Sequence, residues 1–119
     1  MDLLDRIHEF IAAVNQMREE ANSKGTSEYM RSYYKPLEIR NGRVSGDWLI
    51  LDSVSGGSRS VYAFIRLTDG ANKTLGAMKS GDIHKPATYK APAKHARGNV
   101  FSDDFGASCA GLYGIAYLR

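Results

Sequence analysis

The chain has 119 residues, of which 43% are hydrophobic and 24% charged. These proportions are ordinary for a globular protein and exclude a disordered chain. Sixteen Lys and Arg residues against 13 Asp and Glu give a net charge of +3, which is too small to indicate a polyanionic partner by itself. Length and composition predict one domain over residues 1–119 that folds without disulfides.

The cysteine count and the N-terminal residues indicate the cellular compartment. Cys109 is the sole cysteine, which excludes an intramolecular disulfide and favours a reducing cytoplasm. The start, MDLLDRIHEF, carries acids where a secretory signal carries a basic region. No stretch approaches the ~18 apolar residues that a membrane helix requires. We therefore expect a soluble, unexported protein with no membrane partner.

The N-terminal segment has the period of an amphipathic helix. Its apolar stripe consists of Leu3, Leu4, Ile7, Phe10, Ile11, Val14 and Met17. Asp2 is the expected N-cap, and residues 22–25 carry the stop signals of a helix end. We expect this helix to cover a hydrophobic core and to carry no catalytic group.

After a polar connector, the period changes from helical to alternating. Leu37 and Ile39 lead into the dipeptide NG at 41–42, which predicts a short strand and a tight turn. The stretch DWLILDSV also alternates, with Trp48 and Ile50 on one face and the leucines between and after them on the other. The turn SGGS and the strand RSVYAFIRL follow, which together predict a hairpin.

The second half of the chain has weaker strand signals. A short strand is predicted within residues 73–79, and a last sheet strand or extended edge within 83–89, because Pro86 tolerates only an edge or bulge. The tail predicts a terminal strand or a segment pinned to the core, with exposed tyrosines that leave a homo-oligomer open. Its apolar residues are Leu112, Tyr113, Ile115, Tyr117 and Leu118.

These elements predict an α+β fold. The N-terminal helix packs on an antiparallel β-meander of four or five strands, an irregular basic segment lies across one edge, and a C-terminal strand closes the chain. No internal repeat and no domain boundary is found.

The segment KAPAKHARG concentrates positive charge within nine residues. Pro92 suits the first position of a helix and Gly98 the residue after its end, which predicts a helical turn with Lys94 and Arg97 facing the same way. Tyr89 places an aromatic ring beside these cations, as in surfaces on which nucleotides stack. The alternative is a solvated face whose charges pair weakly with exposed acids. The candidate acids are Glu38, Asp103 and Asp104.

The sequence YKAPAKHARGNVF, followed by DDFGASCAGLYGIAYL, resembles a family of small uncharacterised proteins of tailed bacteriophages. In that family a Trp or Tyr precedes KAPAKHARG, an aromatic residue follows a few positions later, and the chain closes with YG and AYL. The resemblance covers the C-terminal third, including GDIHKPATYK, and more loosely VYAFIRL. It implies expression in the cytoplasm of an infected bacterial host, and it brings no established activity with it.

Other constellations favour structure over chemistry. His8, His84 and His95 form no metal motif with a single cysteine, so no metal or other cofactor is expected. Cys109 lies in GASCAG among small residues, which favours close packing over a nucleophile paired with His95. Asp103 and Asp104 are interpreted as local caps or as partners of Arg97. Neither GxxxxGK[ST] nor GxGxxG occurs, and we expect no enzymatic activity.

The leading hypothesis is a small phage protein that binds nucleic acid, in single-stranded form, in replication or gene expression. The hypothesis rests on the basic segment, on the family resemblance and on a half-open sheet showing Tyr62 and Phe64. The expected nucleic-acid-binding residues are Lys85, Tyr89, Lys90, Lys94, His95 and Arg97. Two alternatives stay open: a protein–protein module that inhibits a host enzyme or defence complex, and a minor structural protein of the virion.

Overall fold

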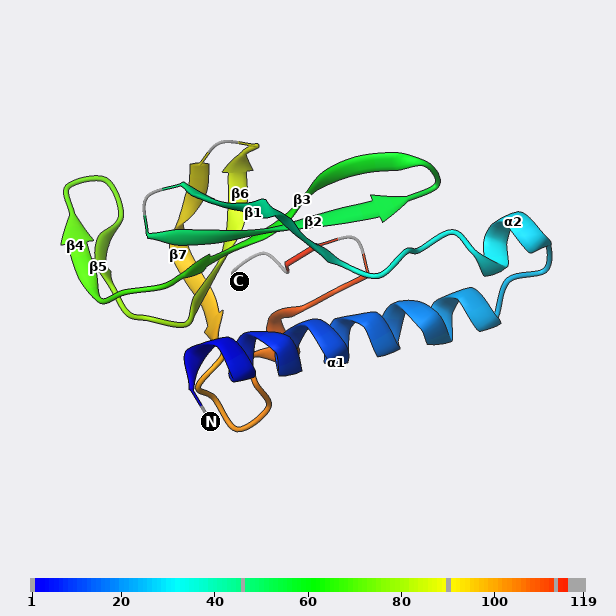
Figure 1. Cartoon of the computed structure of the whole chain (residues 1–119), viewed down its shortest axis with the longest axis horizontal. Helices are drawn as coiled ribbons and strands as arrows, with labels where there is room; N and C mark the ends of the chain where they lie inside the picture. Colours follow the sequence, from blue (N-terminus) through cyan, green and yellow to red (C-terminus); the bar gives the residue numbers. More distant parts are fainter. Residues whose placement is uncertain (1, 46, 90, 113, 116–119) are drawn as a thin grey trace.

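A computed structural model shows helix α1 over Leu3–Ser23 (Figure 1). The structure describes residues 2–45, 47–89, 91–112 and 114–115, with the backbone alone for residues 41–45. The Asp2 carboxylate caps α1 by accepting a hydrogen bond from the Asp5 N–H at 2.8 Å. Ile7, Phe10 and Val14 are buried, whereas Leu4 is 53% exposed. The predicted helix and its cap are confirmed, with a narrower buried stripe.

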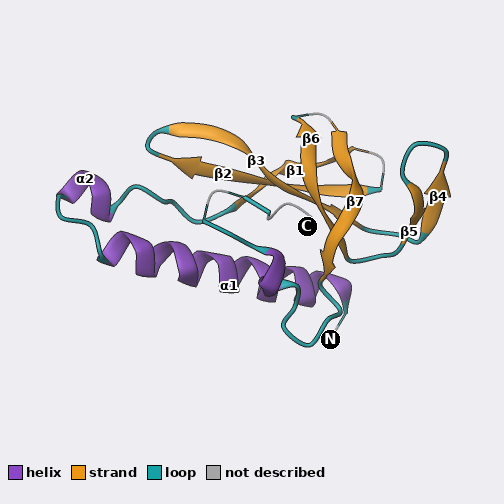
Figure 2. Cartoon of the chain, turned by 180° about the vertical axis from the view of Figure 1, so that it is seen from behind, coloured by secondary structure: helices purple, strands orange, loops and turns teal. Residues whose placement is uncertain are grey.

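Five of the strands form an antiparallel sheet in the order β1-β2-β3-β6-β7, and β4 and β5 form a separate two-stranded sheet. This arrangement confirms the predicted α+β meander. Figures 1 and 2 both show α1 running along one side of the sheet, while β6 and β7 cross the direction of β1 to β3 steeply. The bounds are α2 Glu28–Arg31, β1 Glu38–Ser45, β2 Trp48–Ser55, β3 Ser58–Arg66, β4 Gly70–Asn72, β5 Gly76–Met78, β6 Asp82–Thr88, β7 Ala91–Asn99 and the 3-10 turn η1 Ala107–Cys109.

The β2–β3 hairpin turns at Gly56 and Gly57, as predicted. Their φ angles of 57° and 83° are both positive, which is the backbone of a two-residue type I′ turn. Ser55 and Ser58 close the turn as a paired position. A Cβ on Gly56 would also stand 2.7 Å from the Tyr33 ring, so this position tolerates glycine alone.

A β-bulge in β3 decides which aromatic side chains are buried. Leu51 pairs with Ala63 and the next residue, Asp52, pairs with Val61, so Tyr62 is the extra residue. Tyr62 and Ala63 consequently both join the core beneath α1. The Tyr62 hydroxyl donates a hydrogen bond to the Gly111 carbonyl at 2.7 Å.

A second cluster covers the opposite face of the sheet. It consists of Trp48, Ile50, Phe64 and Met78. Met78 comes from the small β4–β5 hairpin, an insertion between β3 and β6. The alternation expected for β2 is confirmed, but the expected half-open sheet is wrong because Tyr62 and Phe64 are fully buried. Neither ring is available for stacking.

Three further expectations about strands are corrected or refined. β1 continues through the dipeptide at 41–42, with a register irregularity between Ile39 and Val44, so the predicted turn there is wrong. The region 73–79 contributes β5 and the turn before it. β6 is an inner strand: Pro86 is tolerated because β3 pairs with β6 only at Ile83 and His84, before the proline.

The C-terminal segment is pinned to the core. Ile115 is buried and forms an isolated antiparallel bridge with Ala110. Apart from this bridge, the described part of the tail contains no strand. Tyr113, Tyr117 and Leu118 lie outside the described residues. Within the described ranges, no helix is both long and apolar enough to cross a membrane.

Candidate functional site

The basic segment is a β-strand, and the predicted helical turn is wrong. β7 lies at the edge of the sheet and pairs with β6 from Thr88↔Ala91 to Asp82↔Asn99. Three register shifts interrupt the ladder, so the strand is irregular, as expected of the segment. Pairing with β6 over residues 91–99 overrides the local helix signals. Lys94 and Arg97 therefore do not share the face of a helix.

The structure brings the predicted site residues together on the β6–β7 hairpin, but in different environments. Tyr89 lies in the connecting turn and is 65% exposed. Lys94 and His95 are exposed on β7. Lys85, on β6, is half-buried and donates from Nζ to the Ile115 carbonyl at 3.1 Å. Lys90 lies outside the described residues.

Arg97, like Lys85, is less accessible than Lys94 and His95. Its side chain is half-buried, and its Nε is shielded from solvent with no hydrogen-bond partner. The expected partner Asp104 is engaged elsewhere, because its carboxylate accepts from the N–H groups of Gly106 at 3.0 Å and Ser108 at 2.8 Å. The hydrogen bonds from Ser108 lower the pKa of Asp104. Asp104 is thus a local cap, one of the two roles expected of it.

Gly98 and Cys109 form a close contact between β7 and η1. A Cβ on Gly98 would lie 3.0 Å from the Cys109 Sγ. Positive φ angles occur at five described glycines, and Gly98 is not among them, so Gly98 does not end a helix as predicted. Burial raises the pKa of the Cys109 thiol to about 11, and the nearby Asp104 carboxylate adds to this shift. The thiol is therefore protonated at neutral pH and packs rather than reacts, as the sequence indicates.

His84 is a buried polar residue that the sequence patterns do not single out. Its Nδ1 lies 2.7 Å from the Ala93 carbonyl, which can only accept, so Nδ1 carries the proton. Its ring stands edge-on to Trp48 at 5.0 Å between centroids. His84 therefore ties the irregular part of β7 to the second core, and it holds the strand that presents Lys94 and His95.

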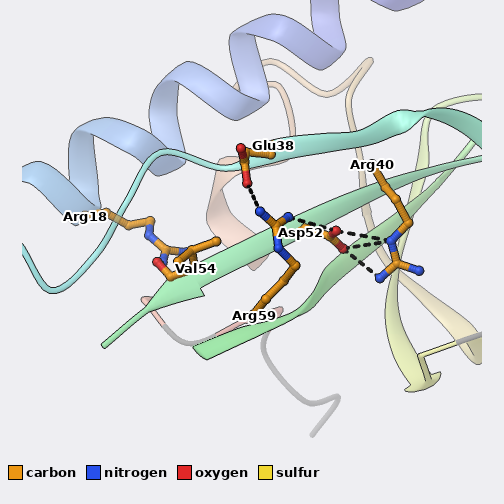
Figure 3. A network of polar contacts seen from close by, with 6 residues as sticks. All are labelled: Arg18, Glu38, Arg40, Asp52, Val54 and Arg59. Atoms are coloured by element: carbon orange, nitrogen blue, oxygen red, sulfur yellow. Dashed lines mark hydrogen bonds and ion pairs between the residues drawn. The ribbon is translucent and has the colours of Figure 1, made fainter. Parts of the chain in front are cut away.

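A polar network spans β1, β2 and β3 on the sheet (Figure 3). The buried Asp52 carboxylate accepts from Arg40 in a forked contact of 2.8–3.1 Å and from Arg59 at 3.3 Å. Arg59 also contacts Glu38 at 2.6 Å. Hydrogen bonding to Glu38 raises the pKa of Arg59. Glu38 is thus engaged by Arg59, and among the described residues of the basic segment none pairs with it.

Arg18 is a second buried polar residue that sequence reasoning missed. It lies on the buried face of α1, but a charged side chain does not count as part of an apolar stripe. Its guanidinium donates to the Ser53 Oγ at 2.8 Å and to the Val54 carbonyl at 3.0 Å, and the Tyr34 ring lies 5.1 Å away. Figure 3 shows the side chain reaching from the helix to β2. Burial lowers the pKa of Arg18, and the tyrosines nearby oppose this effect.

The three histidines are dispersed over α1, β6 and β7. In the part of the chain that the structure describes, no group of three or more His, Cys, Asp or Glu side chains is arranged to hold a metal ion. The arrangement that remains is an exposed basic edge strand preceded by an exposed tyrosine, and it is suited to non-covalent binding.

Comparison with known proteins gives a family but no activity. No curated protein and no solved structure matches this chain. The matching family model is described as a family of unknown function, and that description names no source organism, so the bacteriophage resemblance stays a prediction. Because the model matches residues 4–116, the chain belongs to the family of unknown function DUF7717.

Proposed function

We propose that the β6–β7 hairpin binds single-stranded nucleic acid, in the cytoplasm of an infected bacterial cell. The observation that carries the proposal is the exposure of Lys94 and His95 on an edge strand that follows the exposed ring of Tyr89. Lysine neutralises phosphates without reading sequence, and a base can stack on tyrosine whatever its identity. The cellular setting rests on the family resemblance alone.

Two acidic side chains near this hairpin accept hydrogen bonds from groups of the chain, which is compatible with the proposal. Asp82 accepts from the Lys79 N–H at 2.9 Å and from the Asn99 side-chain amide at 2.9 Å. Asp104 caps the turn that leads to η1. Both carboxylates are thus held by amide N–H groups of the chain, which fix their positions and leave their negative charge in place.

The aromatic surface available for stacking is smaller than the sequence indicates. With Tyr62 and Phe64 buried, stacking falls to Tyr89 on the hairpin. Lys85 is hydrogen-bonded to the C-terminal segment and Arg97 is half-buried, so the phosphate contacts fall to Lys94 and to Lys90, which lies outside the described residues. A few charge contacts imply weak binding with a shallow salt dependence.

The test is a titration of fluorescein-labelled oligo(dT) of 12 nucleotides across a series of salt concentrations. Lys94→Ala should weaken binding a few-fold at low salt and reduce the slope of log K against log salt by about 0.7. Lys73→Ala is the matched control, because Lys73 is exposed in the turn between β4 and β5. Absence of binding at 20 mM salt, or equal slopes for both variants, would show that the proposal is wrong.

A second candidate is a protein partner that adds a strand to β7. β7 is an edge strand, and an exposed edge offers backbone N–H and carbonyl groups to another chain. Pro92 and the charged side chains of β7 oppose unselective pairing of this kind. Purification from infected cells with nuclease separates the candidates: a protein partner stays bound and a nucleic acid is lost.

A further inference from the structure

The second exposed aromatic ring near β7 stands at its other end. Phe101 follows the strand closely and is 45% exposed, whereas Tyr89 precedes the strand. Nine residues of extended strand separate the two rings, roughly 30 Å at ~3.3 Å per residue. That length suits a short oligonucleotide within the range of about 4–16 nucleotides that single-strand binding domains cover.

The ring of Phe101 is held in place from behind. Gly81 has a φ of 87°, and a Cβ there would come within 2.9 Å of the ring, so the turn at Gly81 fits directly against it. The Arg6 guanidinium lies 5.2 Å from the centroid of this ring and 5.4 Å from that of Phe105. Arg6 is itself fixed by donating to the Val100 carbonyl at 3.2 Å. The ring is thus pre-positioned, with the Arg6 cation held over it.

Phe101 also borders an open hollow of about 500 Å³, a volume within the range of small-molecule sites. The hydroxyl residues Ser80 and Ser102 and the cation Lys79 line it as well. Two carboxylates, Asp69 and Asp82, stand in its wall, with the Asp69 Oδ1 accepting from the Ser80 N–H at 2.8 Å. Two negative charges against one lysine disfavour a phosphate in the hollow and leave room for a neutral ring with polar edges.

We propose that this hollow holds one base of the bound strand, stacked on Phe101, so that the nucleic acid runs the length of β7 from Tyr89 to Phe101. The proposal rests on the proposed function and names a second contact point for it. The phosphates of the strand between Tyr89 and Phe101 pass Lys94. The base at the Phe101 end turns away from its neighbouring bases and enters the hollow.

The experiment compares Phe101→Leu with Tyr29→Ala in titrations of the same labelled 12-nucleotide oligo(dT). Leucine keeps apolar contact with Gly81 and Arg6 but removes the ring, and a thermal melt checks that the fold is intact. Phe101→Leu should weaken binding roughly 5- to 100-fold. Tyr29→Ala should leave it unchanged, because this exposed tyrosine lies on α2, away from β7.

A second arm uses the uncharged nucleoside thymidine and follows the ring protons of Phe101 by NMR, where we expect selective shifts on titration. If Phe101→Leu binds the oligonucleotide as tightly as the unmodified protein does, the hollow is not a base-binding site, and the proposed function still stands. If thymidine shifts the Phe101 ring protons but no oligonucleotide binds, the hollow is a nucleoside site and the strand-binding function is wrong. Absence of both signals overturns both proposals.

Discussion

At the scale of single residues, Gly98 and Cys109 show how little space separates β7 from the C-terminal segment. The thiol of Cys109 donates to the Gly106 carbonyl at 3.1 Å and lies against the one position in β7 that has no side chain. A Cβ at position 98 would lie 3.0 Å from the Cys109 Sγ, so the cysteine would have to shift to make room for it. The glycine is therefore required by contact with its neighbour, and its own backbone angles would suit other residues.

Gly98→Ala should lower the free energy of unfolding by about 1–3 kcal/mol, because the added methyl overpacks the contact with the Cys109 Sγ. Urea denaturation measures the change. The same substitution made in a Cys109→Ala background should cost less, since alanine leaves room for the new methyl. An equal cost in both backgrounds would mean that crowding by the sulfur is not the cause.

At the scale of elements, the success of sequence reasoning depends on how local the decisive interactions are. Helix α1 and the β2–β3 hairpin are predicted because their caps and turn glycines lie within a few residues of the groups they satisfy. β7 is not, because its proline and glycine mimic helix ends while the deciding contacts come from β6. The hydrogen bond from His84 to the Ala93 carbonyl has no counterpart in any local pattern.

The candidate site is predicted in part for the same reason. Composition finds the basic segment, and the structure places Lys94 and His95 on its surface. Exposure of the sheet aromatics is not predictable, because the bulge at Tyr62 and the covering β4–β5 hairpin both depend on contacts between distant strands. Phe101 escapes notice because its support comes from Arg6, at the other end of the chain.

Asp52, on β2, links the two strands that flank β2 in the sheet. Its buried carboxylate is the common acceptor for Arg40 from β1 and Arg59 from β3. Asp52→Asn should lower the free energy of unfolding by about 1–3 kcal/mol, because it leaves two arginines without their shared anion. The partial exposure of both arginines keeps this cost below that of a fully buried pair.

Glu38→Gln is the control for Asp52→Asn within the same network. Glu38 is half-exposed and, within the part of the chain that the structure describes, pairs with the exposed Arg59 alone, so its substitution should cost about 0–1 kcal/mol. Chemical denaturation at two salt concentrations measures both. A larger loss for Glu38→Gln than for Asp52→Asn would place the stabilising contact at the exposed pair and contradict this account.

At the scale of the whole molecule, two layers meet over one core, and the contact is apolar along most of α1. Ile7, Phe10 and Val14 pack on the sheet, and the next position on that face, Arg18, is charged and equally buried. Among the described residues no carboxylate pairs with it; its partners are a hydroxyl, a carbonyl and the Tyr34 ring. The end of the helix is therefore docked by directed hydrogen bonds to β2.

Arg18→Ala should cost about 2–4 kcal/mol of unfolding free energy. It opens a cavity between the layers and leaves the buried Ser53 hydroxyl and Val54 carbonyl without their donors. Arg18→Met fills the volume without restoring the donors, so it should recover only the cavity part of the loss. Glu19→Ala, at the exposed neighbouring position of the same helix, should change stability by less than about 0.5 kcal/mol. Thermal and urea unfolding of the three variants tests this order. If Arg18→Ala were no more costly than Glu19→Ala, the helix would be docked by its apolar face alone and the hydrogen bonds to β2 would contribute nothing.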